Sequence, residues 1–193
     1  SRIWRNSIIN EYGISSIWSS GVVAARDIAD GITSLAVIRG NIVTENWGQG
    51  ISTYEADRTI IEDNIISDSY VTNVYIHDAT NITCQRNLIY TDPKSYAYPY
   101  GAHRGILMGD ERDIPSTNIS IMNNILFGNN WNYALNTGTN VITGVLLANN
   151  TLVNGIISGG ISLRGYHQNI RFENNIILQE NELPLVVITL DPD

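Results

Sequence analysis

The stretch Asn-Ile-Ser-Ile-Met-Asn-Asn-Ile-Leu at residues 118–126 returns as Asn-Ile-Arg-Phe-Glu-Asn-Asn-Ile-Ile at residues 169–177. In both stretches an Asn has an apolar residue three positions before it and another two positions after it. The same pattern recurs along the chain at Asn6, Asn41, Asn64, Asn87, Asn124, Asn150 and Asn175. Repetition at this period is typical of a solenoid.

The spacing of the Asn column defines the coils. Successive Asn residues are 35, 23, 23, 37, 26 and 25 residues apart, and the two long intervals carry insertions at about 10–20 and 91–104. A second column, at Gly21, Gly50, Asn73, Gly105, Asn132 and Gly160, opens short strands. Strand alternation points Ile51, Val74, Ile76, Ile106, Met108, Leu135, Ile161 and Leu163 inward. We predict an all-β parallel solenoid of about seven coils, with the Asn column as an internal ladder of side-chain amides.

Composition sets the class of protein and its partners. The 193 residues are 43% hydrophobic and 16% charged, as in one globular β-rich domain spanning 1–193. A net charge of −8 with Lys94 as the single lysine argues against nucleic acid or an anionic membrane as a partner. Cys84 is the single cysteine, which excludes an internal disulfide and predicts a core position. No apolar run is long enough to insert into a membrane.

Both ends of the sequence lie inside the repeat. Ser1 falls within a coil, and the last apolar strand is expected at 185–190, so neither end shows a polar cap. We expect a fragment of a longer protein, or a partner chain that caps the coils.

The two quoted stretches resemble the repeats of the pectate-lyase-like superfamily of right-handed parallel β-helices, and the resemblance covers nearly the whole chain. It implies that right-handed fold, an extracellular or cell-surface location and chemistry on polysaccharide. Three Asn-x-Ser/Thr sequons, at Asn81, Asn118 and Asn149, agree with that location. Members include polysaccharide lyases, glycoside hydrolases, epimerases and non-catalytic surface proteins. The hydrolase motifs of the superfamily, Gly-His-Gly among them, are absent from the sequence.

The two insertions predict a binding cleft. They leave the coil at the same corner with two coils between them, so they are expected to wall a cleft ~14 Å wide. Aromatic rings stack well on the apolar faces of sugars. We predict that a polysaccharide or oligosaccharide binds through Trp18, Tyr54, Tyr75, Tyr96, Tyr98, Tyr100, His103 and Arg164. The alternative is that these tyrosines only pack on the coil surface.

Acidic residues follow the second column. Asp57 lies seven residues after its column position, whereas Asp78 and Asp110 both lie five residues after theirs, so the latter two are expected to stack. Together with Glu111 they predict either a calcium site or a general acid/base pair, and solvated turns are the third interpretation.

The residues predicted to be catalytic are Asp78, Asp110, Arg104 and His77. His77 faces the presumed cleft and can act as a base, whereas Arg104 can grip a carboxylate with two hydrogen bonds. Strand alternation places the side chains of His77 and Asp78 on opposite faces, so they are not expected to be partners.

Two hypotheses for function follow. The first is a carbohydrate-binding or carbohydrate-active β-helix, lyase-like or hydrolase-like. The second is a non-catalytic structural or adhesin-type module of a surface protein. Whether the chain is an enzyme at all stays open at this point.

Overall fold

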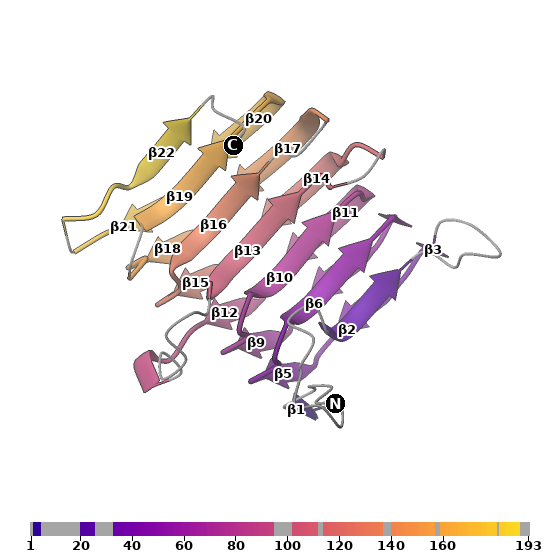
Figure 1. Ribbon diagram of the computed structural model, residues 1–193, viewed down its shortest axis with the longest axis horizontal. Coiled ribbons are helices and arrows are strands. Elements are labelled where there is room, and N and C mark those ends of the chain that lie inside the picture. The colour runs from indigo at the N-terminus through magenta and orange to yellow at the C-terminus, as the bar shows by residue number, and fades with distance from the viewer. Residues whose placement is uncertain are drawn as a thin grey trace, which may run out of the picture.

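The described chain winds into a parallel β-solenoid whose three sheets run along one axis (Figure 1). The computed structural model describes residues 2–4, 20–25, 33–94, 102–111, 114–136, 140–156, 159–180 and 182–189. Each complete coil adds to sheet 1, then to sheet 2, then to sheet 3. Sheets 1 and 3 have seven strands each, so six complete turns separate the first strand from the last. The expected all-β solenoid is therefore confirmed.

The strands are short and follow each other closely. Sheet 1 contains β2 (Ser20–Ala25), β6 (Gln49–Tyr54), β10 (Thr72–His77), β13 (Arg104–Gly109), β16 (Trp131–Asn136), β19 (Gly159–Arg164) and β22 (Val186–Thr189). Sheet 2 contains β3 (Thr33–Ser34), β4 (Val37–Arg39), β7 (Ala56–Asp57), β8 (Ile60–Glu62), β11 (Thr80–Gln85), β14 (Thr117–Met122), β17 (Ile142–Ala148) and β20 (His167–Glu173). Sheet 3 contains β1 (Arg2–Trp4), β5 (Ile42–Thr44), β9 (Ile65–Ser67), β12 (Leu88–Tyr90), β15 (Ile125–Phe127), β18 (Thr151–Val153) and β21 (Ile176–Leu178).

The core is a set of apolar columns that run along the axis. Val74 pairs with Ile51 of the preceding coil and with Ile106 of the following one, and all three are fully buried. Every residue predicted to point inward from sheet 1 is buried, which confirms the alternation. Cys84 also lies in the core, where burial raises the pKa of its thiol to about 12. Stacking like residues buries β-branched side chains with little unfilled space.

The predicted Asn ladder is present. Asn87 receives hydrogen bonds on its Oδ1 from the backbone N–H and the Nδ2 of Asn64, each at 3.0 Å. It donates in turn to Oδ1 of Asn124, at 2.9 Å from its backbone N–H and 3.0 Å from Nδ2. The ladder lies at the corner between sheets 2 and 3 and continues from Asn41 to Asn175 among the described residues.

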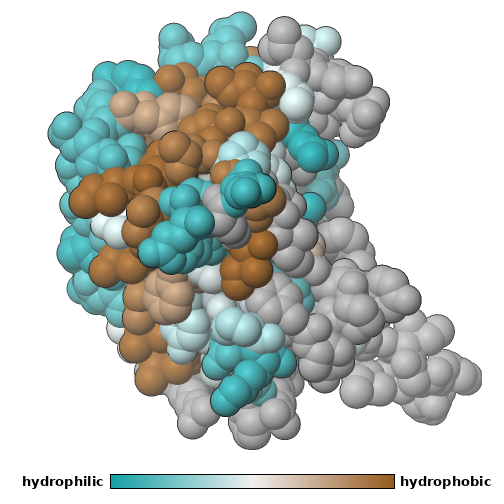
Figure 2. Space-filling model, turned by 90° about the vertical axis from the view of Figure 1, so that its left-hand side faces the viewer, coloured by the Kyte–Doolittle hydropathy of each residue, from teal (hydrophilic) through white to brown (hydrophobic). Residues whose placement is uncertain are grey.

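The last coil has no further coil beside it among the described residues. Apolar side chains of β20, β21 and β22, such as Phe172, Ile176 and Ile188, are exposed there. Figure 2 looks onto this end of the molecule and shows apolar residues gathered on it.

Candidate functional site

Strand register brings one row of polar and aromatic residues together on the outer face of sheet 1. His77, the last residue of β10, pairs with Tyr54 of β6 and with Gly109 of β13. The next residue of each coil therefore occupies an equivalent position, which aligns Glu55, Asp78 and Asp110. All three acidic residues are buried. Register thus places Asp78 and Asp110 at equivalent positions of successive coils, and Glu55 at the same position of the coil before.

His77 and Asp78 are partners, contrary to our expectation. Nδ1 of His77 lies 3.0 Å from Oδ2 of Asp78. Asp78 has a φ of 50°, in the left-handed region, so strand alternation ends at His77 and the carboxylate turns back toward the imidazole. With Nδ1–H donated to Asp78, Nε2 is the basic nitrogen of the ring. Among the described residues Nε2 of His77 makes no hydrogen bond.

Two tyrosine rings hold the imidazole in place. The Tyr75 ring stacks on His77 with centroids 4.4 Å apart and planes 10° apart, and the Tyr54 ring lies at 4.7 Å. The hydroxyl of Tyr75 donates to Oε1 of Glu111. Burial, assisted by that hydrogen bond, raises the pKa of Tyr75, so the phenol keeps its proton. Tyr75 is only 4% exposed and thus supports His77 more than it offers a surface for a sugar.

The backbone of Glu111 ties this group to Asp78. Its N–H donates to Oδ1 of Asp78 at 3.2 Å. The His77–Asp78 and Tyr75–Glu111 pairs are therefore one hydrogen-bonded unit, in which both oxygens of Asp78 accept bonds from protein groups. The His77 side chain is 13% exposed. A ligand would meet the basic nitrogen of the unit at this exposed part of the imidazole.

Asp110 is held differently. Its two oxygens accept the backbone N–H and the Nδ2 of Asn140, at 2.7 Å and 2.8 Å. Burial raises the pKa of Asp110, the bonds from Asn140 lower it, and the charge of Asp78 raises it, with a net upward shift. Asp110 thus anchors the segment before β17, and each of its oxygens already accepts one hydrogen bond from Asn140. Its predicted catalytic role has no support in this geometry.

Arginines lie on the same face. Arg104 begins β13, at the end of sheet 1 opposite to His77, and is half-buried, and burial lowers the pKa of its guanidinium. The charge of Arg164 acts in the same direction, so the two groups are close enough to interact. Arg164 ends β19, is exposed, and lies in the same row of the sheet as His77. These cations can bind a carboxylate.

The carboxylates do not fit the predicted calcium site. Calcium takes six to eight oxygen ligands, and a calcium ion here would compete with the hydrogen bonds that Asp78, Asp110 and Glu111 accept from protein groups. Across the described residues, no group of three or more His, Cys, Asp or Glu side chains is arranged to hold a metal. Calcium stays a prediction without structural support, and no step below depends on it.

Other predicted residues lie elsewhere. Trp18, Tyr96, Tyr98 and Tyr100, with the greater part of both insertions, are outside the described residues. His103 precedes β13, at the opposite end of sheet 1 from His77, and is buried. Its Nδ1 lies 3.3 Å from the Ser69 carbonyl, and its ring meets the edge of Tyr70. This placement gives His103 a packing role at the corner.

Sequence reasoning missed Glu55. Counting from the second column aligned Asp57 with Asp78, but Asp57 lies on sheet 2 and accepts bonds from Arg58 and Asn81. The pairing of Tyr54 with His77 is the signal that identifies Glu55 as the residue equivalent to Asp78.

Comparison with known proteins gives one match. The family model described as "Right handed beta helix region" matches residues 3–177. No curated protein and no solved structure matches the chain significantly. In the part of the chain that the structure describes, no helix is long and apolar enough to cross a membrane.

Proposed function

The chain belongs to the right-handed β-helix family, and from this premise we propose that the outer face of sheet 1 binds an acidic polysaccharide and cleaves it by a lyase-like reaction. The observation that carries the proposal is the His77 imidazole, which is oriented by buried Asp78 and has Nε2 available. A base oriented by a buried carboxylate is a recurring arrangement in proton abstraction.

The charges of sheet 1 favour a lyase over a hydrolase. Hydrolysis of a glycoside ordinarily uses two carboxyl groups that face the scissile bond. Here Asp78 and Asp110 are occupied by protein donors. Elimination instead needs one base and a cation to neutralise the uronate carboxylate; His77 can supply the base, and Arg164, in the same row of sheet 1 three strands away, is the cation proposed for the carboxylate.

The reaction is a β-elimination. Nε2 of His77 takes the proton from the carbon that bears the uronate carboxylate. The electron pair left behind forms a carbon–carbon double bond as the neighbouring carbon–oxygen glycosidic bond breaks, and the released oxygen takes a proton from solvent. The products are one chain with an unsaturated uronate end and one with a free hydroxyl. A polysaccharide substrate places the protein outside the cell or on its surface, and the sequons at Asn81, Asn118 and Asn149 are all exposed.

The test measures the ultraviolet absorbance of unsaturated uronate. Polygalacturonate, alginate and hyaluronan are each incubated with the purified chain, with and without calcium. We expect cleavage of at least one, reduced about 10²- to 10⁴-fold by His77→Ala and clearly reduced by Asp78→Asn. His167→Ala, which removes an imidazole from β20 of sheet 2, is the matched control and should retain activity.

The alternative is a non-catalytic structural or adhesin-type module. One observation favours it, because Tyr75, Asp78 and Asp110 are all buried and each is satisfied by a protein partner, as in a network that only stabilises the coils. If no polyuronate is cleaved or bound by the wild-type chain, this alternative replaces the lyase proposal.

A further inference from the structure

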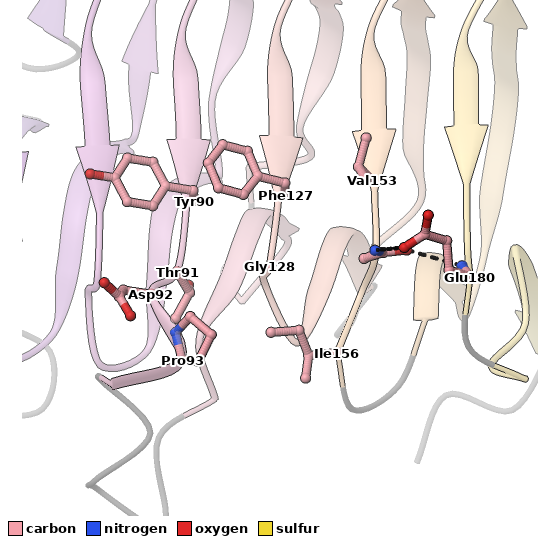
Figure 3. Close-up of a pocket in the computed structure, with 10 residues that line it drawn as sticks. Tyr90, Thr91, Asp92, Pro93, Phe127, Gly128, Val153, Ile156 and Glu180 are labelled. Atoms are coloured by element: carbon pink, nitrogen blue, oxygen red, sulfur yellow. Dashed lines mark hydrogen bonds between the residues drawn. The ribbon is translucent and has the colours of Figure 1, made fainter.

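Sheet 3 carries a groove that is separate from the face of sheet 1 described above. It has a volume of about 900 Å³ and lies beyond the ends of β12, β15 and β18. That volume is within the range of small-molecule sites. Figure 3 shows residues of the groove contributed by four successive coils, from Tyr90 at one end to Glu180 at the other. Three strand spacings are ~14 Å, which accommodates about two or three sugar rings laid along the axis.

Aromatic rings form one side of the groove. Tyr90 pairs with Phe127 in register, and their rings are 5.0 Å apart with planes only 3° apart. Figure 3 shows the two rings side by side on neighbouring strands. Val153 continues the column on the next strand, and Ile156 lies near Gly128 (Figure 3). Phe127 is 38% exposed and Ile156 36% exposed, so this apolar surface faces solvent.

Carboxylates stand at both ends of the aromatic and apolar surface. At one end Asp92 is exposed. At the other, Glu180 and Asn154 bind each other reciprocally: Nδ2 of Asn154 donates to Oε2 of Glu180 at 2.9 Å, and the N–H of Glu180 donates to Oδ1 of Asn154 at 3.0 Å. This pair fixes the wall and leaves Oε1 of Glu180 as an acceptor for a ligand hydroxyl.

We propose that this groove binds a neutral oligosaccharide, laid along the solenoid axis with its ring faces against Tyr90 and Phe127. Tyr90 and Phe127 stack on each other, so sugar C–H groups pack on the ring surface that this stack leaves exposed, and sugar hydroxyls donate to Asp92 and Glu180. The inference goes beyond the lyase proposal, because it concerns a different sheet and requires no reaction. It gives the chain a second site that retains glycan whether or not sheet 1 is catalytic.

The charge of the groove and the pairing of its strands favour a neutral oligosaccharide over an acidic glycan or a peptide. None of the described residues that line the groove is Lys or Arg, two of them are Asp92 and Glu180, and the chain carries a net charge of −8, so these residues repel an acidic glycan. A peptide that binds by strand addition needs an open sheet edge. β15 is paired on both sides, with β12 and with β18, so the floor of the groove offers no such edge.

The test is isothermal titration calorimetry of the full chain with cellohexaose, xylohexaose and chitohexaose, and with hexagalacturonate as the acidic probe. We expect at least one neutral hexamer to bind and hexagalacturonate not to bind at this groove. Phe127→Ala should weaken the affinity about tenfold or more, whereas Tyr90→Phe, which keeps the ring, should change it less than about twofold. His77→Ala, which tests sheet 1, should leave the affinity unchanged.

Ile125→Ala is the matched control. Ile125 lies on the same strand as Phe127 and is 48% exposed, but it does not line the groove. The proposal is overturned if no neutral hexamer binds, or if Ile125→Ala weakens binding as much as Phe127→Ala does. It is also overturned if Phe127→Ala leaves the affinity unchanged, or if the chain self-associates in a way that Phe127→Ala abolishes, since the occupant would then be a second copy.

Discussion

Asn87 illustrates how single residues hold the coils together. It is buried and takes part in hydrogen bonds to the Asn on either side, and its Nδ2 also donates to the Ile61 carbonyl at 3.0 Å. Asn175, at the end of the described ladder, is half-buried and bonds to Asn150 and to the Leu147 carbonyl. Asn87 thus has a ladder Asn on each side, whereas Asn175 has one on a single side among the described residues.

We expect Asn87→Ala to lower the free energy of unfolding by about 3 kcal/mol, because it leaves buried donors and acceptors of Asn64 and Asn124 unpaired. Asn175→Ala should cost about 1 kcal/mol, since water can replace the lost bonds there. Urea denaturation of both variants measures the difference. Equal losses of stability in the two variants would mean that burial of Asn87 inside the ladder adds nothing to its hydrogen bonds.

Glu62 links three coils at the surface of sheet 2. It accepts hydrogen bonds from Gln85, Arg39 and Arg86, at 2.7 Å, 2.6 Å and 2.6 Å. These bonds, with that from Gln85 the largest contribution, lower the pKa of Glu62 from its usual value of 4.5. A carboxyl whose pKa is lower in the folded state stabilises the fold above the unfolded pKa, and this stabilisation is lost as pH falls through the folded pKa.

We therefore expect Glu62→Gln to destabilise the chain near neutral pH and to approach the wild type as the pH falls below about 4. Chemical denaturation of both proteins across a pH series measures this. A difference in stability that stays constant with pH would show that the charge of Glu62 contributes nothing.

At this scale the sequence predicts side-chain direction only while the backbone stays in a regular strand. Alternation placed Ile76 and Met108 correctly, but it failed at Asp78, whose positive φ has no signature in the residue type alone. His103 was expected in a cleft because it is polar and lies in an insertion. In the fold it is instead packed against Tyr70.

Among the elements, β13 shows why the second column favours glycine. A Cβ on Gly105 would lie 2.4 Å from the Asn132 carbonyl oxygen and 3.0 Å from Cδ2 of Leu126. The constraint is a close approach between strands and not an unusual φ. Asn occupies the same column at other coils, where its side chain bonds inside the corner, as Asn73 does with Ser69 and Asn129.

Gly105→Ala should therefore lower the free energy of unfolding by about 2–3 kcal/mol, because β13 and β16 must separate to admit the methyl group. Gly40→Ala is the control. Gly40 has open space around it and a φ of +67°, so its substitution should cost only about 1 kcal/mol of backbone strain. Thermal unfolding of the two variants compares them, and a larger loss for Gly40→Ala would refute the packing argument.

The groove on sheet 3 was not foreseen, although its signal is visible in hindsight. Tyr90 and Phe127 both lie three residues after a ladder Asn, at an outward position of two successive coils. The repeat pattern is defined by the Asn and by the apolar residues three positions before and two positions after it, so the two aromatic residues one position further on lie outside it. Like residues at an outward position of successive coils can mark a binding surface, just as like residues at inward positions mark the core.

For the whole molecule, stability depends on neighbouring coils. Each central strand, such as β13, is paired on both sides, whereas β20, β21 and β22 are paired on one side among the described residues. In a solenoid the stability of a region is close to the sum of such neighbour terms.

Amide hydrogen exchange should therefore be slowest in β10, β13 and β16 and faster in β20, β21 and β22, where one side of each strand faces solvent. Exchange measured by mass spectrometry on peptides from these strands provides the comparison. Uniform protection from β10 to β22 would mean that the coils unfold as one cooperative unit and would contradict additive coupling.

The Asn ladder has a direction. Each ladder Asn from Asn41 to Asn150 donates to the oxygen of the next ladder Asn, so the side-chain amide dipoles point the same way along the axis and add. Aligned hydrogen bonds also polarise one another. An all-β chain thereby acquires a macrodipole of the kind usually associated with helices. Its positive pole lies toward Asn175 and its negative pole toward Asn41, so the two ends of the solenoid differ electrically even where their side chains are alike.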